Sequence, residues 1–181
     1  RNHLWQSGTH LRPTMGQGHD ERGSIVGTWI YVIALSQINI NRTYMYPEHL
    51  VHPMRMDIVA GGFQELKLAS EVEDVMAKPG TTLVFFNSVC GCSASTARPG
   101  VKHAVASSAK KPNQLVTVFA GVDPEAVQKA REYTLPYPPS SPSIALFKDG
   151  ELVHFVERHH IEGRSADMIA GHLEGVFDEF C

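Results

Sequence analysis

The chain has 181 residues and a mass of 19.9 kDa, enough for one domain with an appendage but not for two full domains. Hydrophobic residues make up 43% and charged residues 19%, so the chain can bury a core. The net charge of -3 excludes the strongly positive field that nonspecific binding to nucleic acid or an anionic membrane requires. Three cysteines are too few for a disulfide-stapled secreted scaffold.

Residues 1–44 differ in character from the rest of the chain. Residues 1–23 are polar, rich in Gly and His and without periodicity, which predicts a poorly ordered segment. Residues 25–40 are uncharged and largely apolar, but a membrane-spanning helix needs about 20 such residues. The residues before this run carry no net positive charge, so they do not form the flank that a signal peptide has. We therefore expect an N-terminal extension over residues 1–44, no membrane span, and a folded domain over residues 45–181.

A helix and two short elements are predicted at the start of this domain. Pro47 suits a first helical turn, and a Gly-Gly pair after residue 60 then ends the helix. Its apolar residues recur at helical spacing, at Leu50, Met54, Ile58 and Val59. Residues 63–68 form a candidate strand. Ser70 and Glu73 predict a capping box for a short helix over residues 71–77.

Two buried strands are predicted by runs of β-branched and aromatic residues, at residues 81–87 and 114–120. A helix over residues 90–108 is expected between them, with an interruption at its Pro-Gly pair. A further helix over residues 124–133 begins with proline and has Asp123 as its cap.

The last elements are a hairpin and a helix. Residues 143–148 and 151–157 alternate as strands, and Asp149-Gly150 between them is typical of a type I′ turn. Ser165 caps a final amphipathic helix. The apolar positions of this helix are Met168, Ile169, Leu173, Val176 and Phe177. Helices between buried strands imply parallel pairing, and the hairpin adds antiparallel strands. The predicted fold class is therefore α/β, a mixed central sheet with helices on both faces.

A Cys-Gly-Cys motif stands where the first buried strand ends and a helix begins. Ligands bind at this edge of open α/β sheets. Free amides at a helix start stabilise negative charge, so Cys90 is expected to lose its proton easily and to act as a nucleophile. Cys92 lies within disulfide reach, and Gly91 lets the backbone bend to close a strained, easily reduced ring. The motif predicts a redox-cycling dithiol.

Two other interpretations of the pair remain open. Cys90 and Cys92 could be ordinary buried cysteines, because free cysteine is often buried. They could also bind a metal as soft ligands, together with His103 or with His159 and His160. The C-x-C spacing is unusual for a zinc site and no second cysteine pair exists, so we predict no metal.

A proline directly precedes the strand at residues 143–148. Proline cannot donate to a sheet ladder, so Pro142 belongs at the first strand position or in a special turn, and a cis Ser141–Pro142 peptide would fit. A thiol pair after a central strand, with a proline opening a later hairpin that ends in Lys-Asp-Gly, resembles the thioredoxin fold. The resemblance implies that Pro142 is the cis-proline beside the sulfurs and that Ser141 offers backbone groups to an extended substrate.

Longer blocks resemble the bacilliredoxin family, bacterial thioredoxin-like proteins with a C-G-C site. The blocks are residues 53–66, 87–100 and 141–170, within a resemblance that runs from about Met45 to Cys181. It implies a cytoplasmic thiol–disulfide oxidoreductase that removes bacillithiol, a low-molecular-weight thiol, from S-bacillithiolated client proteins. Bacillithiol is then a co-substrate, and no bound cofactor is expected. Some members are described as disulfide isomerases, so a general isomerase or reductase is the alternative, with a thiolate metal-binding protein as the rival from another class.

Two features depart from the wider thioredoxin pattern. Val89 stands where a Trp usually precedes the first cysteine, and the spacing is C-x-C in place of C-x-x-C. The strand at residues 81–87 contains no acid that could take up the proton of Cys92. The sequence therefore leaves open how Cys92 is deprotonated and which reductant restores the dithiol.

Other polar residues are weaker candidates. Arg98 lies near the motif and could hold a carboxylate of the small thiol, with a solvated helix residue as the alternative. The cluster of Arg158, His159, His160 and Glu162 is more typical of a hydrogen-bonded turn than of a substrate site. Cys181 is interpreted as a tail residue, with a third redox thiol as the alternative. The methionines, Met54 and Met56 among them, are predicted to lie in the core.

Overall fold

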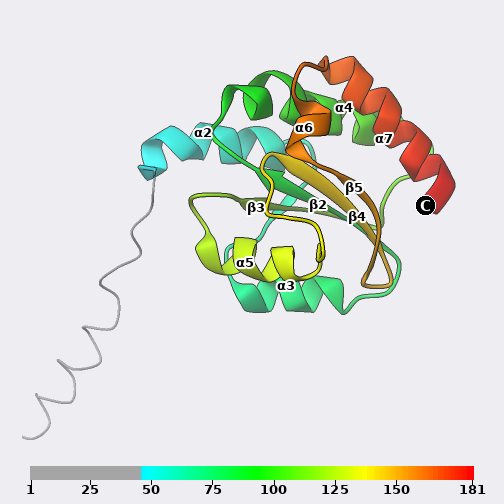
Figure 1. Ribbon diagram of the computed structural model, residues 1–181, viewed down its shortest axis with the longest axis horizontal. Coiled ribbons are helices and arrows are strands. Elements are labelled where there is room, and N and C mark those ends of the chain that lie inside the picture. The colour runs from blue at the N-terminus through cyan, green and yellow to red at the C-terminus, as the bar shows by residue number, and fades with distance from the viewer. Residues whose placement is uncertain (1–45) are drawn as a thin grey trace, which may run out of the picture. The chain divides into compact units, whose positions relative to one another are not determined.

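The computed structural model describes residues 46–181 (Figure 1), so the predictions for residues 1–44, including the apolar run at residues 25–40, lie outside the described residues. The helices are α2 (Glu48–Val59), α3 (Ala69–Met76), α4 (Arg98–Ser107), α5 (Pro124–Glu132), α6 (Arg158–Ile161) and α7 (Ala166–Phe180), with a π-helical segment η1 (Ser93–Ala97) before α4. The strands are β1 (Gln64–Glu65), β2 (Thr81–Asn87), β3 (Gln114–Phe119), β4 (Ser143–Lys148) and β5 (Glu151–Val156).

The five strands form one mixed sheet in the order β1-β3-β2-β4-β5. The central strand β2 pairs in parallel with β3 and antiparallel with β4, and β4 pairs antiparallel with β5. Because β4 alone runs the opposite way, its first residue lies at the same sheet edge as the last residues of β2 and β5. This topology brings three segments that are distant in the sequence to one edge.

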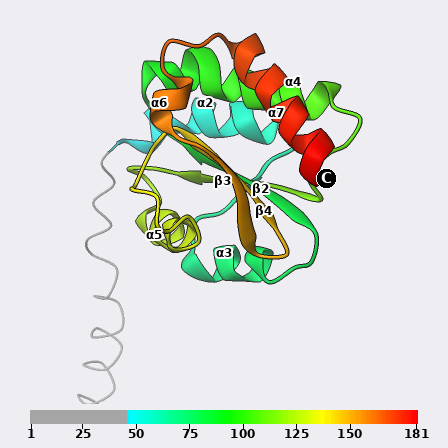
Figure 2. The same ribbon diagram turned by 45° about the vertical axis from the view of Figure 1, so that its right-hand side comes forward.

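Helices cover both faces of the sheet (Figure 2). On one side α4 packs against α7, with α2 beside α4, and on the other side α3 packs against α5. Successive residues of β2 enter opposite cores, because side chains alternate along a strand. Leu83 and Phe85 lie in the core under α4 and α7, whereas Val84 and Phe86 lie in the core under α3 and α5. The expected thioredoxin-like α/β fold is confirmed.

Several local predictions agree with the structure. β2 has the bounds predicted for it, and Ser141–Pro142 is a cis peptide. Asp149 and Gly150 both have positive φ, 51° and 83°, as a type I′ turn requires. Ser165 caps α7 by accepting a hydrogen bond from the amide of Met168 over 3.2 Å. Within residues 46–181, no helix combines the length and apolar character needed to cross a membrane.

The interruption predicted at Pro99-Gly100 is wrong, because the helix continues through both residues. Proline lacks an amide hydrogen, and its ring clashes with a regular preceding α-turn. The wider π-turn of η1 comes directly before Pro99, where Arg98 N bonds to Ser93 O, five residues back. The chain therefore accommodates the proline by widening the helix and not by ending it.

Two predicted caps are also wrong. α3 begins at Ala69, and the Glu71 carboxylate accepts the amides of Lys67 and Leu68 at 2.6 and 2.9 Å. The Ser70–Glu73 pair therefore does not form the capping box. Asp123 precedes α5 but makes no side-chain cap, because the guanidinium of Arg55 takes up its carboxylate.

The buried face of α2 differs from the predicted one. Ile58 is buried as predicted, but Leu50 is 51% exposed, and Val51 and Arg55 face inward. The helix is rotated because its inner face holds the charged side chain of Arg55, which an apolar pattern does not reveal. Two methionines predicted as core residues are likewise exposed, Met56 at 50% and Met168 at 51%.

Candidate active site

Three segments meet at the sheet edge where β2 ends: the Cys90-Gly91-Cys92 turn after β2, the proline loop before β4, and α6 after β5. The amide of Arg158, the first residue of α6, donates to Ser140 Oγ over 2.8 Å. Its guanidinium Nη1 donates to the carbonyl oxygen of Ser141 over 3.4 Å. These bonds tie α6 to the proline loop, and the charge of Arg158 acts on both thiols.

Cys90 occupies the N-cap position of the helix. Its carbonyl oxygen accepts the amides of Ser93 at 3.1 Å and Ala94 at 3.2 Å, and the next two residues are helical. The amide of Ser93 also lies 3.3 Å from Cys90 Sγ and donates to it. The Ser93 amide is thus shared between the carbonyl oxygen and the sulfur of Cys90, in the place where an N-cap side chain accepts a first-turn amide. The sulfur therefore lies where backbone dipoles favour a negative charge.

The electrostatics of Cys90 favour the thiolate. Burial alone would raise its pKa, but hydrogen bonds from Cys92, Ser88 and the Ser93 amide lower it, as does the positive charge of Arg158. The net effect is a pKa below the ordinary value of a thiol. The hydroxyl of Ser88 contributes a direct bond to Cys90 Sγ of 3.2 Å. Because the thiolate is the nucleophilic form, the lowered pKa makes Cys90 better suited than an ordinary thiol to attack a disulfide.

Cys92 has the opposite tendency. Burial raises its pKa first, and the hydrogen bond and the negative charge of Cys90 raise it further. Both thiols are free and partly exposed. The pair therefore combines one thiol that ionises more readily than an ordinary thiol with a hydrogen-bonded partner that holds its proton more firmly, as expected for an attacking and a resolving thiol.

Buried polar side chains hold the cysteine turn in place. Asn87 is fully buried, and its Oδ1 accepts bonds from the Ser88 amide at 2.9 Å, from Ser93 Oγ at 2.9 Å and from Arg98 Nη1 at 3.2 Å. Arg98 also donates to the Ser88 carbonyl at 3.2 Å and pairs with Asp57 at 3.4 Å. At 5% exposure, Arg98 is placed to position the turn. Its contact with the carboxylate of a small thiol stays a prediction.

The proline loop is shaped as the sequence suggested. Pro142 is cis and directly precedes β4, and Ser143 Oγ donates to the Ser140 carbonyl over 2.8 Å. The carbonyl of Ser141 accepts the guanidinium of Arg158, so a substrate strand at Ser141 would meet that side chain as well. The substrate-binding roles of Ser141 and Pro142 stay predictions.

The metal alternative lacks a third ligand at the thiols. Within residues 46–181, the one group of three or more His, Cys, Asp or Glu side chains with ligand atoms within 4.8 Å of one another is Glu157, His159 and His160. Neither cysteine belongs to it. His103, the other histidine considered, pairs with Asp167 over 3.5 Å. The described geometry therefore favours thiol chemistry over a metal centre.

Two features of the site were missed in the sequence. Ser88 stands two residues before Cys90, and its bond to the sulfur has no recognised local signal. The position of Arg158 could have been inferred from the sequence. If the first strand of the β4–β5 hairpin pairs antiparallel with β2, then β5 runs parallel to β2. The residues that follow β2 and β5 must then share an edge, which places Arg158 near the cysteines and not in an isolated turn.

A thiol of lowered pKa at a helix start, a partner thiol two residues on and a cis-proline loop at the same sheet edge define, on this fold, a thiol–disulfide oxidoreductase. The chain matches the family described as disulphide isomerase over residues 46–181. It is 67% identical over 135 residues to a bacilliredoxin of Cytophaga hutchinsonii, covering 75% of this chain and 99% of that one. A bacilliredoxin of Geobacillus kaustophilus is 52% identical over 137 residues, covering 75% and 94%. The chain belongs to the bacilliredoxin family.

Solved thioredoxins are more distant in sequence. The oxidised thioredoxin of Plasmodium falciparum is 17% identical with a TM-score of 0.46, covering 64% of this chain and 97% of that chain. Mitochondrial thioredoxin 3 of Saccharomyces cerevisiae is 14% identical with a TM-score of 0.46, covering 68% and 98%.

Proposed function

We propose that this protein removes bacillithiol from S-bacillithiolated client proteins, with Cys90 as the attacking thiol and Cys92 as the resolving thiol. The observation that supports this most is the opposite shift of the two pKa values, which gives a nucleophile and a proton-bearing partner in one turn. The names of the relatives from Cytophaga and Geobacillus agree with the proposal. Bacillithiol acts as a co-substrate, without a bound cofactor.

The first step is attack of the Cys90 thiolate on the bacillithiol sulfur of the client's mixed disulfide. The client–bacillithiol S–S bond breaks, the client leaves as a thiolate that takes a proton from water, and a Cys90–bacillithiol disulfide forms. The resolving thiolate of Cys92, after losing its proton to solvent, then attacks Cys90 Sγ. Bacillithiol leaves reduced, and the Cys90–Cys92 disulfide carries the two oxidising equivalents until an external thiol reduces it.

A second route for resolution uses free bacillithiol. Its thiolate attacks the bacillithiol sulfur bound to Cys90, so oxidised bacillithiol disulfide leaves and the Cys90 thiolate is regenerated. The first route needs an external thiol to reduce the Cys90–Cys92 disulfide, and the second consumes reduced bacillithiol. A reducing compartment supplies both, so we propose a cytoplasmic location.

The client is proposed to bind as an extended segment along the proline loop. Backbone groups of Ser141, beside cis-Pro142, would pair with the client strand and bring its disulfide to Cys90. Arg98 is the candidate for a carboxylate of bacillithiol, through any donor that its contacts to the cysteine turn leave unused.

Mass spectrometry of the reaction with a purified bacillithiolated client tests the proposal. The wild-type protein should release unmodified client, and Cys90→Ser should release none. Cys92→Ser should accumulate a bacillithiol adduct on Cys90, because the intramolecular resolving step is lost. Cys181→Ser is the matched control and should behave as wild type, because Cys181 is exposed at the chain terminus and contributes to neither pKa shift. Full activity of Cys90→Ser would overturn the assignment.

A general disulfide isomerase is the second candidate, and the description of the matching family favours it. An isomerase attacks protein disulfides and rearranges them, so it should restore activity to a scrambled client that contains no bacillithiol. Comparing the rates on a scrambled and a bacillithiolated client separates the two activities. A faster reaction with the scrambled client would favour the isomerase.

A further inference from the structure

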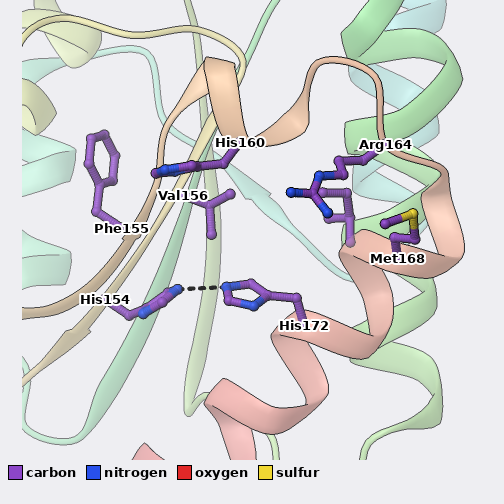
Figure 3. A pocket seen from close by; sticks show the side chains of 8 residues that line it. His154, Phe155, Val156, His160, Arg164, Met168 and His172 are labelled. Atoms are coloured by element: carbon purple, nitrogen blue, oxygen red, sulfur yellow. Dashed lines mark hydrogen bonds between the residues drawn. The ribbon is translucent and has the colours of Figure 1, made fainter.

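A pocket of about 260 Å³ lies between β5 and α7, apart from the cysteine turn (Figure 3). His154 and Val156 enter it from the same face of β5, and α7 closes the opposite side. Residues that line it and bear on its chemistry are His154, Val156, His160, Arg164, Met168 and His172. Nε2 of His154 and Nε2 of His172 are joined by a hydrogen bond of 2.9 Å, drawn as a dashed line in Figure 3.

The polar side chains that line this pocket are three histidines and one arginine. Its lining contains no acidic residue. In Figure 3 the Arg164 side chain extends from the loop before α7 toward His160 and Val156. Within residues 46–181 its guanidinium makes no hydrogen bond or ion pair with another residue. The Glu157 amide donates to Nδ1 of His160 over 3.3 Å, which leaves Nε2 of that ring open. These groups present unused donors to one cavity.

We propose that this pocket binds a small organic carboxylate, with the guanidinium of Arg164 holding the carboxylate beside the His154–His172 pair. A guanidinium offers paired N–H donors that match the two oxygens of a carboxylate. The side chains of Val156 and Met168 supply an apolar wall for the hydrocarbon part of the ligand. Sites for drug-sized ligands run from about 300 to 1,000 Å³, so this pocket suits a smaller metabolite or one end of a larger molecule.

Two imidazole nitrogens 2.9 Å apart would also suit a divalent metal, but two observations oppose one here. The pair of His154 and His172 has no third His, Cys, Asp or Glu ligand within 4.8 Å in the described part of the chain. The cationic side chain of Arg164 in the same lining would repel a divalent cation. The same positive charge attracts an anion.

The surroundings of His154 disfavour its charged form. Burial lowers the pKa of His154, and the neighbouring His172 and His160 lower it further, while Glu179 acts in the opposite direction. An anion bound beside the His154 ring would stabilise its protonated form and raise its pKa. Carboxylate binding should therefore be accompanied by proton uptake at His154.

The pocket is close in the fold to the thiol site through α6. This single turn contains Arg158, whose charge acts on both cysteines, and His160, which lines the pocket. The carboxylate can therefore belong to a free metabolite or to the non-thiol end of a small-thiol substrate. Only the second source rests on the function proposed above.

Binding to the full chain is measured by NMR of labelled histidine rings during a titration with succinate as the probe. The His154 and His172 signals should shift saturably, and the pKa of His154 should rise. Arg164→Gln should weaken binding by about tenfold or more, because a charge-assisted hydrogen bond is lost. Lys111→Gln, which removes a positive charge outside this pocket, should bind as wild type. Absence of a saturable shift, or equal affinity in Arg164→Gln, would overturn the proposal.

Two further arms complete the test. Zinc bound stoichiometrically by the histidine pair, with no response to succinate, would overturn the carboxylate assignment in favour of a metal. Competition separates the two sources: succinate that competitively inhibits reduction of a bacillithiolated client, but not in Arg164→Gln, identifies a substrate carboxylate. An unchanged rate with saturable binding identifies a free metabolite. Because binding is read without turnover, its outcome does not depend on whether the debacillithiolation proposal holds.

Discussion

The hydroxyl of Ser88 donates a hydrogen bond to the sulfur of Cys90 over 3.2 Å, two residues along the same turn. Two hydrogen bonds fix the backbone of Ser88: Arg98 donates to its carbonyl oxygen, and Asn87 Oδ1 accepts from its amide. The hydroxyl therefore meets the sulfur at a fixed position. A bond of this kind is stronger when the acceptor is ionised, so it favours the thiolate over the thiol.

Replacing this hydroxyl should slow the chemistry of Cys90 without unfolding the protein. Ser88→Ala removes a donor to the thiolate, so the pKa of Cys90 rises and its alkylation by iodoacetamide at pH 6 slows several-fold. Ser95→Ala is the matched control, since the Ser95 hydroxyl bonds the Gly91 carbonyl at 2.9 Å in the same turn. Equal slowing in both variants would show that the Ser88 bond has no specific role.

The pH dependence of the reduced protein should follow the lowered pKa of Cys90. Because this pKa is lower in the folded than in the unfolded chain, the thiolate contributes stability above the unfolded value. That contribution is lost as the pH falls through the folded pKa. Urea unfolding of the reduced wild type and of Cys90→Ala across this interval should therefore show a difference that grows with pH. A constant difference would contradict the lowered pKa.

Arg158 should act on the thiols through its charge. The positive charge opposes the raised pKa of Cys92 and helps to lower that of Cys90. Arg158→Gln should therefore move the pH profile of alkylation at both cysteines to higher pH, and Arg158→Lys should restore much of it. Glu162→Gln breaks the 2.6 Å ion pair with Arg158 but leaves the arginine charged. This control therefore distinguishes an effect of the Arg158 charge from an effect of disturbing α6. A profile that moves equally in Glu162→Gln would point to local structure.

The sequence predicts this protein best where the signal is local. The run of β-branched and aromatic residues in β2, the positive-φ turn at Asp149-Gly150 and the hydroxyl cap at Ser165 all depend on neighbouring residues. The thiol pair is local as well, since a helix start after a buried strand places Cys90 at an N-cap. These features were therefore predicted with their correct residues.

The polar network around the site could not be predicted because it joins distant segments. Arg55 and Asp123 are 68 residues apart, and the pattern of α2 gave no reason to place an arginine on its inner face. In the sequence, Asn87 is only the last residue of an apolar strand, but in the structure its side chain accepts the hydrogen bonds that fix the cysteine turn. Such groups are buried only because partners arrive through tertiary structure, which a single apolar period does not encode.

The buried pair of Arg55 and Asp123 should be important for stability. Asp123 is 3% exposed, and its carboxylate oxygens lie 2.8 and 3.1 Å from the guanidinium, which also pairs with Glu65. Arg55→Met leaves this carboxylate buried and unpaired, so the free energy of unfolding should fall by about 3–5 kcal/mol. Lys102→Gln removes the more exposed pair with Asp57 and should cost about 0–1 kcal/mol. Equal losses in urea unfolding would contradict the role of burial.

The contact between α4 and α7 should depend on Gly100. A Cβ atom there would lie 2.9 Å from both the Ala166 carbonyl oxygen and Ile169 Cβ, so the two helices would have to separate. Gly100→Ala should therefore lower the free energy of unfolding by about 1–3 kcal/mol, through overpacking. The helical Gly175 of α7 has no atom within 4 Å of such a Cβ. Gly175→Ala should instead stabilise the protein by about 0.5–1 kcal/mol, because alanine loses less backbone entropy in a helix. Thermal and urea unfolding of the two variants should shift in opposite directions, and a stabilised Gly100→Ala would show that the helices have room to yield.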